Sequence, residues 1–464
     1  MQKLLIGIAA AMTLAVTPTS NAFAQVSADA LGDEGVKYLS EYIRVNTTNP
    51  PGNETLGAEF MAKILRANGI ECQLFETSKG RSCLYARIKG DGTKKAIVLL
   101  NHIDVVPAQA SDWTHPPFSG EIHDGEIWGR GAMDMKGTAI AELETMLALK
   151  RAGKQMHRDV IFLATPDEEV GGTYGAEWFA KHHPELVKDA EFLLNEGYMI
   201  EADSKGQAKY WGVDISEKSV LWLKLTAKGD AGHASMPMPN SAPNRLVRAL
   251  EKIVNNPPAP TVLPAVREFF HSVSSRESEP TRSYFANIDE TVKDPKAYAA
   301  ILPDKLRSAM LRNTVSLTVL KAGYKTNVIP AEATAELDCR LLPGVTKDQF
   351  VEEIKAIMAD PSIEVSVLDN VTAGAAPMNT ALYDAIKAVA AEEQPGIPVV
   401  PVVVPWFTDS HWFRDLGIVG YGFVPVETDP EHLATMHGKN ERVPVAAFKN
   451  GVRRLHKIVS RVVY

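Results

Sequence analysis

The fold is decided by residues 96–104, which read Ala96-Ile97-Val98-Leu99-Leu100-Asn101-His102-Ile103-Asp104. The run opens with five apolar residues and is bounded by polar loops, a pattern typical of a strand that is buried on both faces. His102 and Asp104 come directly after this run, and residues two apart in an extended segment point to the same side. Asp104 is therefore expected to hold the imidazole of His102 through its second nitrogen.

Two more apolar runs favour buried strands of the same kind, Ile161-Phe162-Leu163-Ala164 and Phe192-Leu193-Leu194. The segment after Gly137 repeats apolar residues at helical spacing, which predicts a crossover helix between the first two strands. In an open α/β sheet, ligands bind beyond the carboxyl ends of the parallel strands. The residues expected to converge at that edge are His102, Asp134, Glu168, Glu169 and Glu196, joined by His437 from the far end of the chain.

The chemistry of these side chains indicates a metal site. Imidazole and carboxylate ligands without cysteine suit zinc, with cobalt or manganese less common. Two zinc ions about 3.5–4 Å apart need a bridging carboxylate, ligands on each side and a free carboxylate that takes a proton from water. Asp134 is the natural bridge, because its glycine-rich loop lets the backbone approach metals closely. In the pair Glu168-Glu169, one residue can ligate while its neighbour serves as general base.

A series of short motifs extends across almost the whole chain: NPPGNE (49–54), HIDVVP (102–107), GRGAMDMKG (129–137), DEEVGG (167–172), NEG (195–197), GHAS (232–235), NVIP (327–330) and HGKNER (437–442). In these motifs and in their order, the chain resembles the M20 metallopeptidase family. That family includes glutamate carboxypeptidase, succinyl-diaminopimelate desuccinylase, aminoacylase-1 and carboxypeptidase S. One such motif alone would be weak evidence, whereas the ordered set is specific.

The resemblance implies an α/β fold: a mixed-sheet catalytic domain of the zinc-peptidase type with a smaller inserted α+β domain that acts as lid and dimerisation surface. It also implies two Zn²⁺ ions per active site. The ligands it implies are His102 and Glu196 for one ion, Glu169 and His437 for the other, and Asp134 as the bridge. Glu168 becomes the general base and Asp104 the group that orients His102, and the peptide bond between Asp134 and Met135 is expected to be cis.

The apolar pattern changes near residue 218, where Leu221, Leu223 and Leu225 begin to alternate with polar or aromatic residues. A strand, a helix and a strand follow, which predicts a separate small α+β domain. We therefore expect a catalytic domain in two parts, residues 25–217 and 373–464, interrupted by a lid at 218–372. Residues 256–315 are rich in proline and charge, and the sequence gives them no functional interpretation.

Three residues of the predicted lid receive roles from the resemblance. His233 matches a histidine that stabilises a developing oxyanion, often in the partner's site of a homodimer, and Asn327 matches a residue that assists there. Arg340 matches the arginine that clamps the substrate carboxylate, a task that suits a bidentate guanidinium. The alternatives are a packed turn histidine for His233 and an exposed strand residue for Arg340.

Composition agrees with a globular enzyme: 45% of the residues are hydrophobic, 23% are charged, and the formal net charge is −8. The acidic balance offers no basic patch and so argues against nucleic-acid binding. Residues 1–24 are interpreted as a secretory signal, with Lys3, an apolar stretch and the small-x-small site Ala22-Phe23-Ala24. That stretch is too short for a membrane anchor. A bacterial periplasmic or secreted location is expected.

Cys72 and Cys83 flank a predicted turn over residues 77–80. They either form a disulfide across the hairpin or stand as two free thiols on neighbouring strands. Cys339 is expected to be unpaired and buried. The remaining histidines are interpreted as helix caps or surface residues, namely His115, His123, His157, His182, His183, His271, His432 and His456.

The predicted function is zinc-dependent hydrolysis of an amide bond in short peptides or N-acyl amino acids, of the carboxypeptidase or aminoacylase type. A metal-bridging hydroxide generated by Glu168 is the expected nucleophile. Trp406-Phe407 replaces the small residues of many relatives and either favours an apolar side chain or acyl group in the pocket or packs in the core. The alternatives are an aminopeptidase or a small-molecule deacylase of the same fold, or a non-catalytic periplasmic peptide-binding protein.

Overall fold

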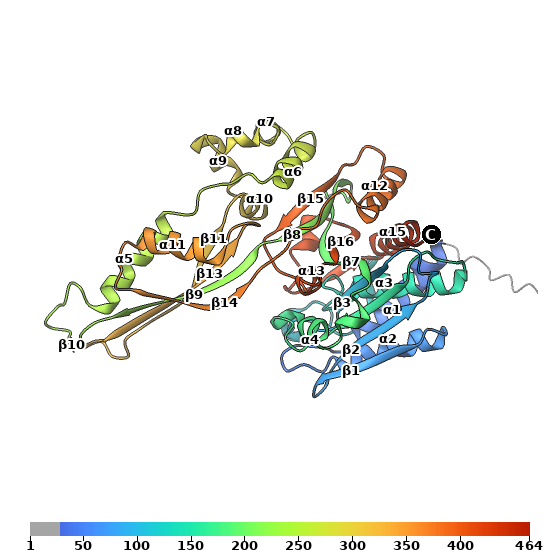
Figure 1. Ribbon diagram of the computed structural model, residues 1–464, viewed down its shortest axis with the longest axis horizontal. Coiled ribbons are helices and arrows are strands. Elements are labelled where there is room, and N and C mark those ends of the chain that lie inside the picture. Colours follow the sequence, from blue (N-terminus) through green and yellow to red (C-terminus); the bar gives the residue numbers. More distant parts are fainter. Residues whose placement is uncertain (1–27) are drawn as a thin grey trace, which may run out of the picture.

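The computed structural model describes residues 28–464, so the predicted signal, residues 1–24, lies outside the described residues. Figure 1 shows a layered α/β part joined to a narrower lobe that extends to one side. Within residues 28–464, no helix combines the length and the apolar character needed to cross a bilayer.

The larger part is built on an eight-stranded sheet in the order β1-β2-β6-β3-β7-β16-β8-β15. β3 (Ala96–His102) pairs in parallel with β6 (Val160–Thr165) and with β7 (Ala190–Ala202), so the three apolar runs of the sequence are neighbours. β2 pairs antiparallel with both β1 and β6, which makes the sheet mixed, as predicted. Its other strands are β1 (Cys72–Ser78), β2 (Arg81–Ile88), β8 (Ala208–Glu217), β15 (Val399–Val404) and β16 (Val419–Thr428).

Helices cover both faces of this sheet, as strands of continuous apolar sequence require. Along β3, Ile97 and Leu99 enter one core while Val98 and Leu100 enter the other, because successive side chains alternate. The predicted crossover helix is α3 (Lys136–Ala152). The first core lies under α1 (Ala28–Ile43), α2 (Thr55–Ala67), α3, α12 (Ala381–Glu393) and α15 (Val445–Val463), and the second under α4 (Ala176–His182) and α13 (Ser410–Arg414).

The lobe is an antiparallel sheet in the order β11-β13-β9-β14, with two helices packed on one face. Leu221, Leu223 and Leu225 are buried beneath those helices, while Trp222 is exposed on the opposite face. A two-residue pairing of β10 (Gly232–His233) with β12 (Val328–Ile329) forms the tip of the lobe (Figure 1). The main elements are β9 (Ser219–Lys228), β11 (Thr314–Ala322), β13 (Glu332–Leu341), β14 (Glu364–Val371), α5 (Ala242–Asn255) and α11 (Lys347–Met358).

Short helices between α5 and β11 lie inside the predicted lid range but pack elsewhere. Phe269, Phe270 and Phe285 share a core with Tyr210 of β8 and Val402 of β15, so these helices cover the edge of the larger sheet. An open sheet edge is a template for unwanted pairing, and covering it removes that hazard. The helices are α6 (Pro264–Ser274), α7 (Thr281–Ala286), α8 (Ile288–Thr291), α9 (Pro295–Ile301) and α10 (Lys305–Met310).

A small sheet of three strands brings the C-terminal segment beside the glycine-rich loop. β5 (Glu126–Trp128) pairs antiparallel with β17 (Arg442–Pro444) on one side and β4 (Ile122–His123) on the other. β5 leads directly into residues 129–134, and His437 lies between α14 (Pro430–Leu433) and β17. The described residues also form the single-turn 3₁₀ helices η1 (Ala110–Asp112), η2 (Glu168–Val170) and η3 (Pro184–Leu186).

Cys72, Cys83 and Cys339 are free thiols. The register of β1 and β2 pairs Cys72 with Ala86 and Cys83 with Phe75, so the first two cysteines do not face each other. The structure therefore decides for free thiols on neighbouring strands. Cys339 is unpaired and buried, as predicted.

Candidate active site

His102 ends β3 and is buried. Its Nδ1 donates to the backbone carbonyl oxygen of Asp104 at 3.0 Å, which leaves Nε2 facing the site. The carboxylate of Asp104 lies 3.7 Å from Nδ1 and has another task. It accepts the backbone N–H groups of Glu168 and Glu169, each at 3.1 Å. Asp104 thus orients His102 through its main chain, where a side-chain contact was predicted, and it fixes the glutamate pair through its side chain.

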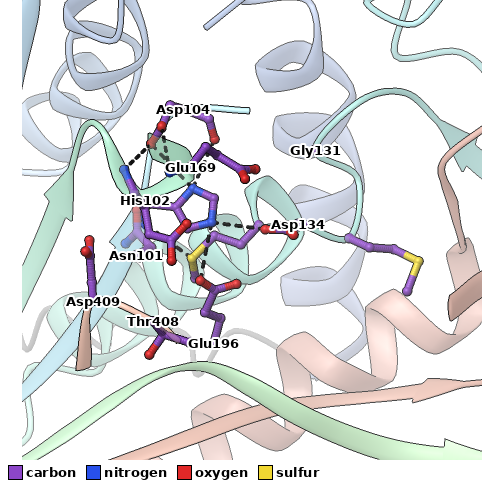
Figure 2. A network of polar contacts seen from close by, with 12 residues as sticks. Asn101, His102, Asp104, Gly131, Asp134, Glu169, Glu196, Thr408 and Asp409 are labelled. Carbon is purple, nitrogen blue, oxygen red and sulfur yellow. Dashed lines mark hydrogen bonds and ion pairs between the residues drawn. The ribbon is translucent and has the colours of Figure 1, made fainter. Parts of the chain in front are cut away.

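Asp134 lies between two groups of side chains. In the first group, shown in Figure 2, Nε2 of His102 is 3.0 Å from Oδ1 of Asp134 and 3.4 Å from Oε1 of Glu196. In the second, Nε2 of His437 is 2.9 Å from Oδ2 of Asp134 and 3.2 Å from Oε2 of Glu169. Each oxygen of one carboxylate therefore faces a different pair of imidazole and carboxylate, the arrangement that a bridging ligand needs.

Glu168 stands at the edge of the first group. Ligand atoms of His102, Glu168 and Glu196 lie within 4.8 Å of one another, and those of His102, Asp134 and Glu169 do so as well. The sequence left open how two adjacent glutamates enter one site. They occupy the tight turn η2, whose backbone N–H groups are held by Asp104, so both carboxylates reach the site from one turn.

Glu441 holds the loop that carries Asp134. Its fully buried carboxylate accepts backbone N–H groups from Gly131 at 3.0 Å, Met133 at 2.9 Å and Asp134 at 3.1 Å. Arg130 donates to the same carboxylate at 2.6 Å. The bond between Asp134 and Met135 is cis, as the resemblance implied. The HGKNER motif contains Glu441, but nothing in the sequence pattern indicates that this residue accepts hydrogen bonds from a loop about 300 residues earlier.

Burial sets the electrostatics of the site. It raises the pKa of Glu196 to about 7, that of Glu168 well above its usual range and that of Glu169 to a lesser degree. Burial also opposes ionisation of Asp134, but hydrogen bonds from two imidazoles keep its pKa below the usual range. Hydrogen bonds to Asp134 and Glu169 raise the pKa of His437 to about 10. The site thus concentrates more negative charge than its two imidazoles can balance.

The donor set fits two zinc ions, with imidazole nitrogens and carboxylate oxygens and no thiolate. Oε1 of Glu169 is buried without a hydrogen-bond partner, and a buried carboxylate oxygen needs a donor or a cation. In the described part of the chain, no lysine or arginine is among the residues that line the cavity around Asp134 and His437. Bound cations are therefore the natural source of the compensating positive charge.

Two cavities meet at these side chains. The inner cavity, of about 330 Å³, has otherwise mainly apolar walls that include Met199, Trp406, Phe407, Leu433 and Met436. The outer cleft, of about 680 Å³, opens between the larger sheet and the lobe. Trp406 and Phe407 line both, so they lie at the pocket, one of the two alternatives that the sequence allowed.

Arg340 projects from β13 into the outer cleft, together with Trp222, Asp338 and Asp369 from the lobe. Its guanidinium donates to both oxygens of Asp338, at 2.7 Å and 3.0 Å. The pairing holds the side chain on the cleft wall, where it faces the same space as Glu168.

His233 and Asn327 lie apart from this centre. Both belong to the tip of the lobe, where the backbone carbonyl of Asn327 accepts the N–H of Ala234 at 3.2 Å. His233 is exposed, and its Nδ1 accepts the backbone N–H of Ser235 at 3.2 Å. Neither His233 nor Asn327 is among the residues that line the two cavities of the single chain described.

Two residues that support the site were not predicted from the sequence, Asp409 and Asn49. Asp409 is buried, accepts the Thr165 hydroxyl at 2.8 Å, and has its pKa raised to about 7 by burial. Asn49 donates to Asp104 at 2.9 Å, which links the NPPGNE motif to the glutamate turn. The motif itself was the only available signal for Asn49, because the contact joins residues far apart in sequence.

Known proteins resemble this chain in both sequence and fold. The sequence model that describes Peptidase family M20/M25/M40 matches residues 98–461 of this chain. A probable carboxypeptidase S-like protein 2 of Dictyostelium discoideum is 33% identical over 366 residues, covering 77% of this chain and 70% of that protein. An N-fatty-acyl-amino acid synthase/hydrolase of Xenopus tropicalis is 30% identical over 387 residues, covering 81% of this chain and 74% of that protein.

Among solved structures, an M20 family metallo-carboxypeptidase from Sulfolobus solfataricus superposes with a TM-score of 0.71. The match covers 92% of this chain and 98% of that one at 20% sequence identity, so it shows that the two proteins share a fold. The family match, in contrast, spans most of the sequence and includes Asp134, Glu168 and His437. On this evidence the protein is a hydrolase, and the chain belongs to peptidase family M20/M25/M40.

Proposed function

We propose that this protein is a di-zinc amide hydrolase that releases an amino acid from an N-acyl amino acid or from a short peptide. The observation that carries the proposal is the position of Asp134, whose two oxygens face two separate pairs, His102 with Glu196 and His437 with Glu169. Zinc bound at these ligands would polarise the scissile carbonyl and lower the pKa of water.

Glu168 is the proposed general base. It lies beside His102 and Glu196 and is not required as a ligand, so its carboxylate is available to accept a proton. The proton comes from the water that adds to the carbonyl carbon, and Glu168 delivers it to the amine nitrogen as the C–N bond breaks. The products are a carboxylic acid and a free amine.

The two cavities suggest how the substrate is oriented. An acyl group or apolar side chain fits the inner cavity among Met199, Trp406 and Met436. The leaving amino acid then occupies the outer cleft, where Arg340 can bind its carboxylate. The names of the two sequence relatives, a carboxypeptidase S-like protein and an N-fatty-acyl-amino acid synthase/hydrolase, agree with a substrate of this class.

A second copy of the chain is part of the proposal. β10, which carries His233, lies at the far end of the lobe (Figure 1), and His233 lines neither the inner cavity nor the outer cleft of its own chain. We therefore assign its oxyanion-stabilising role to the metal centre of a partner in a homodimer. The proposed location is the bacterial periplasm or the medium. Cell fractionation tests the location, and light scattering tests the dimer.

The first experiment strips the mature protein of metal and reloads it with Zn²⁺, Co²⁺ or Mn²⁺. Hydrolysis is then measured with N-acyl amino acids, free dipeptides and dipeptides with an amidated carboxyl end. Zinc-restored cleavage confined to substrates with a free carboxylate supports the proposal. Cleavage of free and amidated substrates at similar rates favours an aminopeptidase or deacylase. No cleavage of any substrate despite two bound metals favours a binding protein.

Glu168→Gln separates chemistry from metal binding. The amide cannot accept the proton, so we expect kcat to fall by about 10²–10⁴-fold. Zinc content stays at two ions per chain, because the five ligands are intact. A variant that turns over at the wild-type rate would remove Glu168 from the mechanism.

A further inference from the structure

A second cluster of metal-binding side chains lies at β4, outside the site described above. Glu121 and His123 are two residues apart in an extended segment and point to the same side. Nε2 of His123 is 2.9 Å from Oε2 of Glu121. His115 stacks on His123, with ring centroids 3.6 Å apart and ring planes at 9°. The three residues place ligand atoms within 4.8 Å of one another.

The backbone around this cluster is well defined. Asp124 and Gly125 connect β4 to β5 with φ angles of 51° and 80°, the positive pair of a type I′ turn, which matches the twist of a hairpin. The backbone N–H of Trp128 donates to the carbonyl of Glu121 at 2.9 Å. The Trp128 ring packs edge-on against His115, with centroids 4.7 Å apart. The hairpin thus holds the carboxylate and both imidazoles on one side.

None of the three residues lines the inner cavity or the outer cleft, so the cluster is separate from the proposed catalytic centre. Its side chains are only partly covered, and metal ions can reach them from solvent. Sequence spacing does not group these residues, because His115 contacts the hairpin only in the folded chain.

We propose that His115, Glu121 and His123 form a third divalent-metal site, which takes a borderline transition ion such as Zn²⁺ or Cu²⁺. Two imidazole nitrogens and one carboxylate oxygen are typical ligands of these ions, and water would complete the coordination. A tetrahedral ion with bonds of about 2.0–2.1 Å holds adjacent ligand atoms about 3.4 Å apart. The contact between His123 and Glu121 needs to widen by only about half an ångström for the ion to replace the shared proton.

His115 must also tilt, because two parallel rings direct their nitrogen lone pairs side by side instead of toward one ion. That movement changes the contact between His115 and Trp128. Metal binding at this site is therefore expected to change the fluorescence of Trp128, and bound Cu²⁺ is expected to quench it.

The test uses the full mature enzyme loaded with two zinc ions per chain. Further Zn²⁺ is added, and bound metal is counted after gel filtration. A parallel titration with Cu²⁺ follows tryptophan fluorescence, with Trp128→Phe to identify the signal. We expect a third equivalent of zinc and quenching that is lost in Trp128→Phe.

His115→Asn and His123→Asn are the site variants, and Glu121→Gln is a milder change of the remaining ligand. Each is expected to weaken the third equivalent at least about tenfold, while the first two equivalents and the hydrolytic rate stay unchanged. His157→Asn is the matched control, since His157 forms a surface pair with Asp91 at 2.9 Å but has no imidazole stacked on it among the described residues. Saturation at two equivalents, or a third equivalent that survives in both histidine variants, would overturn the proposal.

Discussion

Replacing Glu441 with glutamine should destabilise the fold and the metal centre together. The two oxygens of Glu441 accept four hydrogen bonds, two each: Arg130 and Gly131 donate to Oε2, while Met133 and Asp134 donate to Oε1. An amide retains one oxygen, so in either orientation its NH₂ group faces two donors. A hydrogen bond to a charged group contributes about 1.5–3 kcal/mol. Losing two gives an expected decrease in unfolding free energy of about 3–6 kcal/mol.

The assay is urea unfolding of metal-free protein, combined with zinc affinity measured by competition with a chelator. Because Glu441 positions the main chain of Asp134, zinc affinity should fall about 10–100-fold, as for other groups that orient metal ligands. Glu431→Gln is the control: Glu431 also pairs with an arginine of this segment, but its side chain is 76% exposed, and such pairs contribute about 0–1 kcal/mol. If Glu441→Gln matches Glu431→Gln in both measurements, the assigned role of Glu441 is wrong.

Three further changes probe the cleft, the cavity and a buried charge. Arg340→Ala should lower kcat/KM about 10–100-fold for substrates with a free carboxylate, mainly through KM, because a charged hydrogen bond contributes about 1.5–3 kcal/mol; amidated substrates should show no such loss, and an equal loss on both would refute the clamp. Met199→Ala enlarges the inner cavity, so kcat/KM for an acyl chain two methylenes longer than acetyl should rise about tenfold relative to kcat/KM for the acetyl substrate, at about 0.8 kcal/mol per methylene. If the dependence of kcat/KM on chain length is unchanged, the acyl group binds elsewhere. Glu144 of α3 is buried with both oxygens unpartnered, and burial raises its pKa to about 8. The unfolded chain releases this proton near pH 4.5, so the free energy of unfolding falls as pH rises from 4.5 to 8. Glu144→Gln should therefore be about 3 kcal/mol more stable than wild type at pH 7 and almost equally stable at pH 4.5. Thermal melts at the two pH values test this, and an equal difference at both would contradict it.

The centre of the fold could be predicted because its signal is local. Three apolar runs that each end in polar residues predict parallel strands whose carboxyl ends lie at one edge of a sheet. β3, β6 and β7 adopt this arrangement. The residues His102 and Asp134 meet there as expected. Spacing gave the side of the strand on which Asp104 lies, but it could not tell whether the carbonyl or the carboxylate would meet His102, since both lie within reach of the ring.

Pairing across a hairpin is harder to derive, because one shift in register changes every partner. A disulfide between Cys72 and Cys83 requires a turn centred on Thr77 and Ser78. The chain instead turns at Lys79 and Gly80, with Ser78 opposite Arg81 and a register shift just before it. The left-handed φ of 79° at Gly80 supplies the reason, since glycine adopts that conformation without strain.

The position of the lobe tip follows neither from local pattern nor from the chemistry of a single chain. β10 and β12 bring the motifs of His233 and Asn327 together through only two paired residues on each side, although nearly a hundred residues separate them in sequence. A pairing this short contributes little stability, and the side chain of His233 is exposed. Two residues that are held together without a packing role, such as His233 and Asn327, are expected where both act on the same bound group. Neither residue lines the inner cavity or the outer cleft of its own chain, and we therefore expect their shared target to lie on a second copy. A mixture of inactive Glu168→Gln and inactive His233→Ala chains tests this directly, because a heterodimer would regain one complete site, whereas no recovered activity despite mixed dimers would return His233 to a structural role.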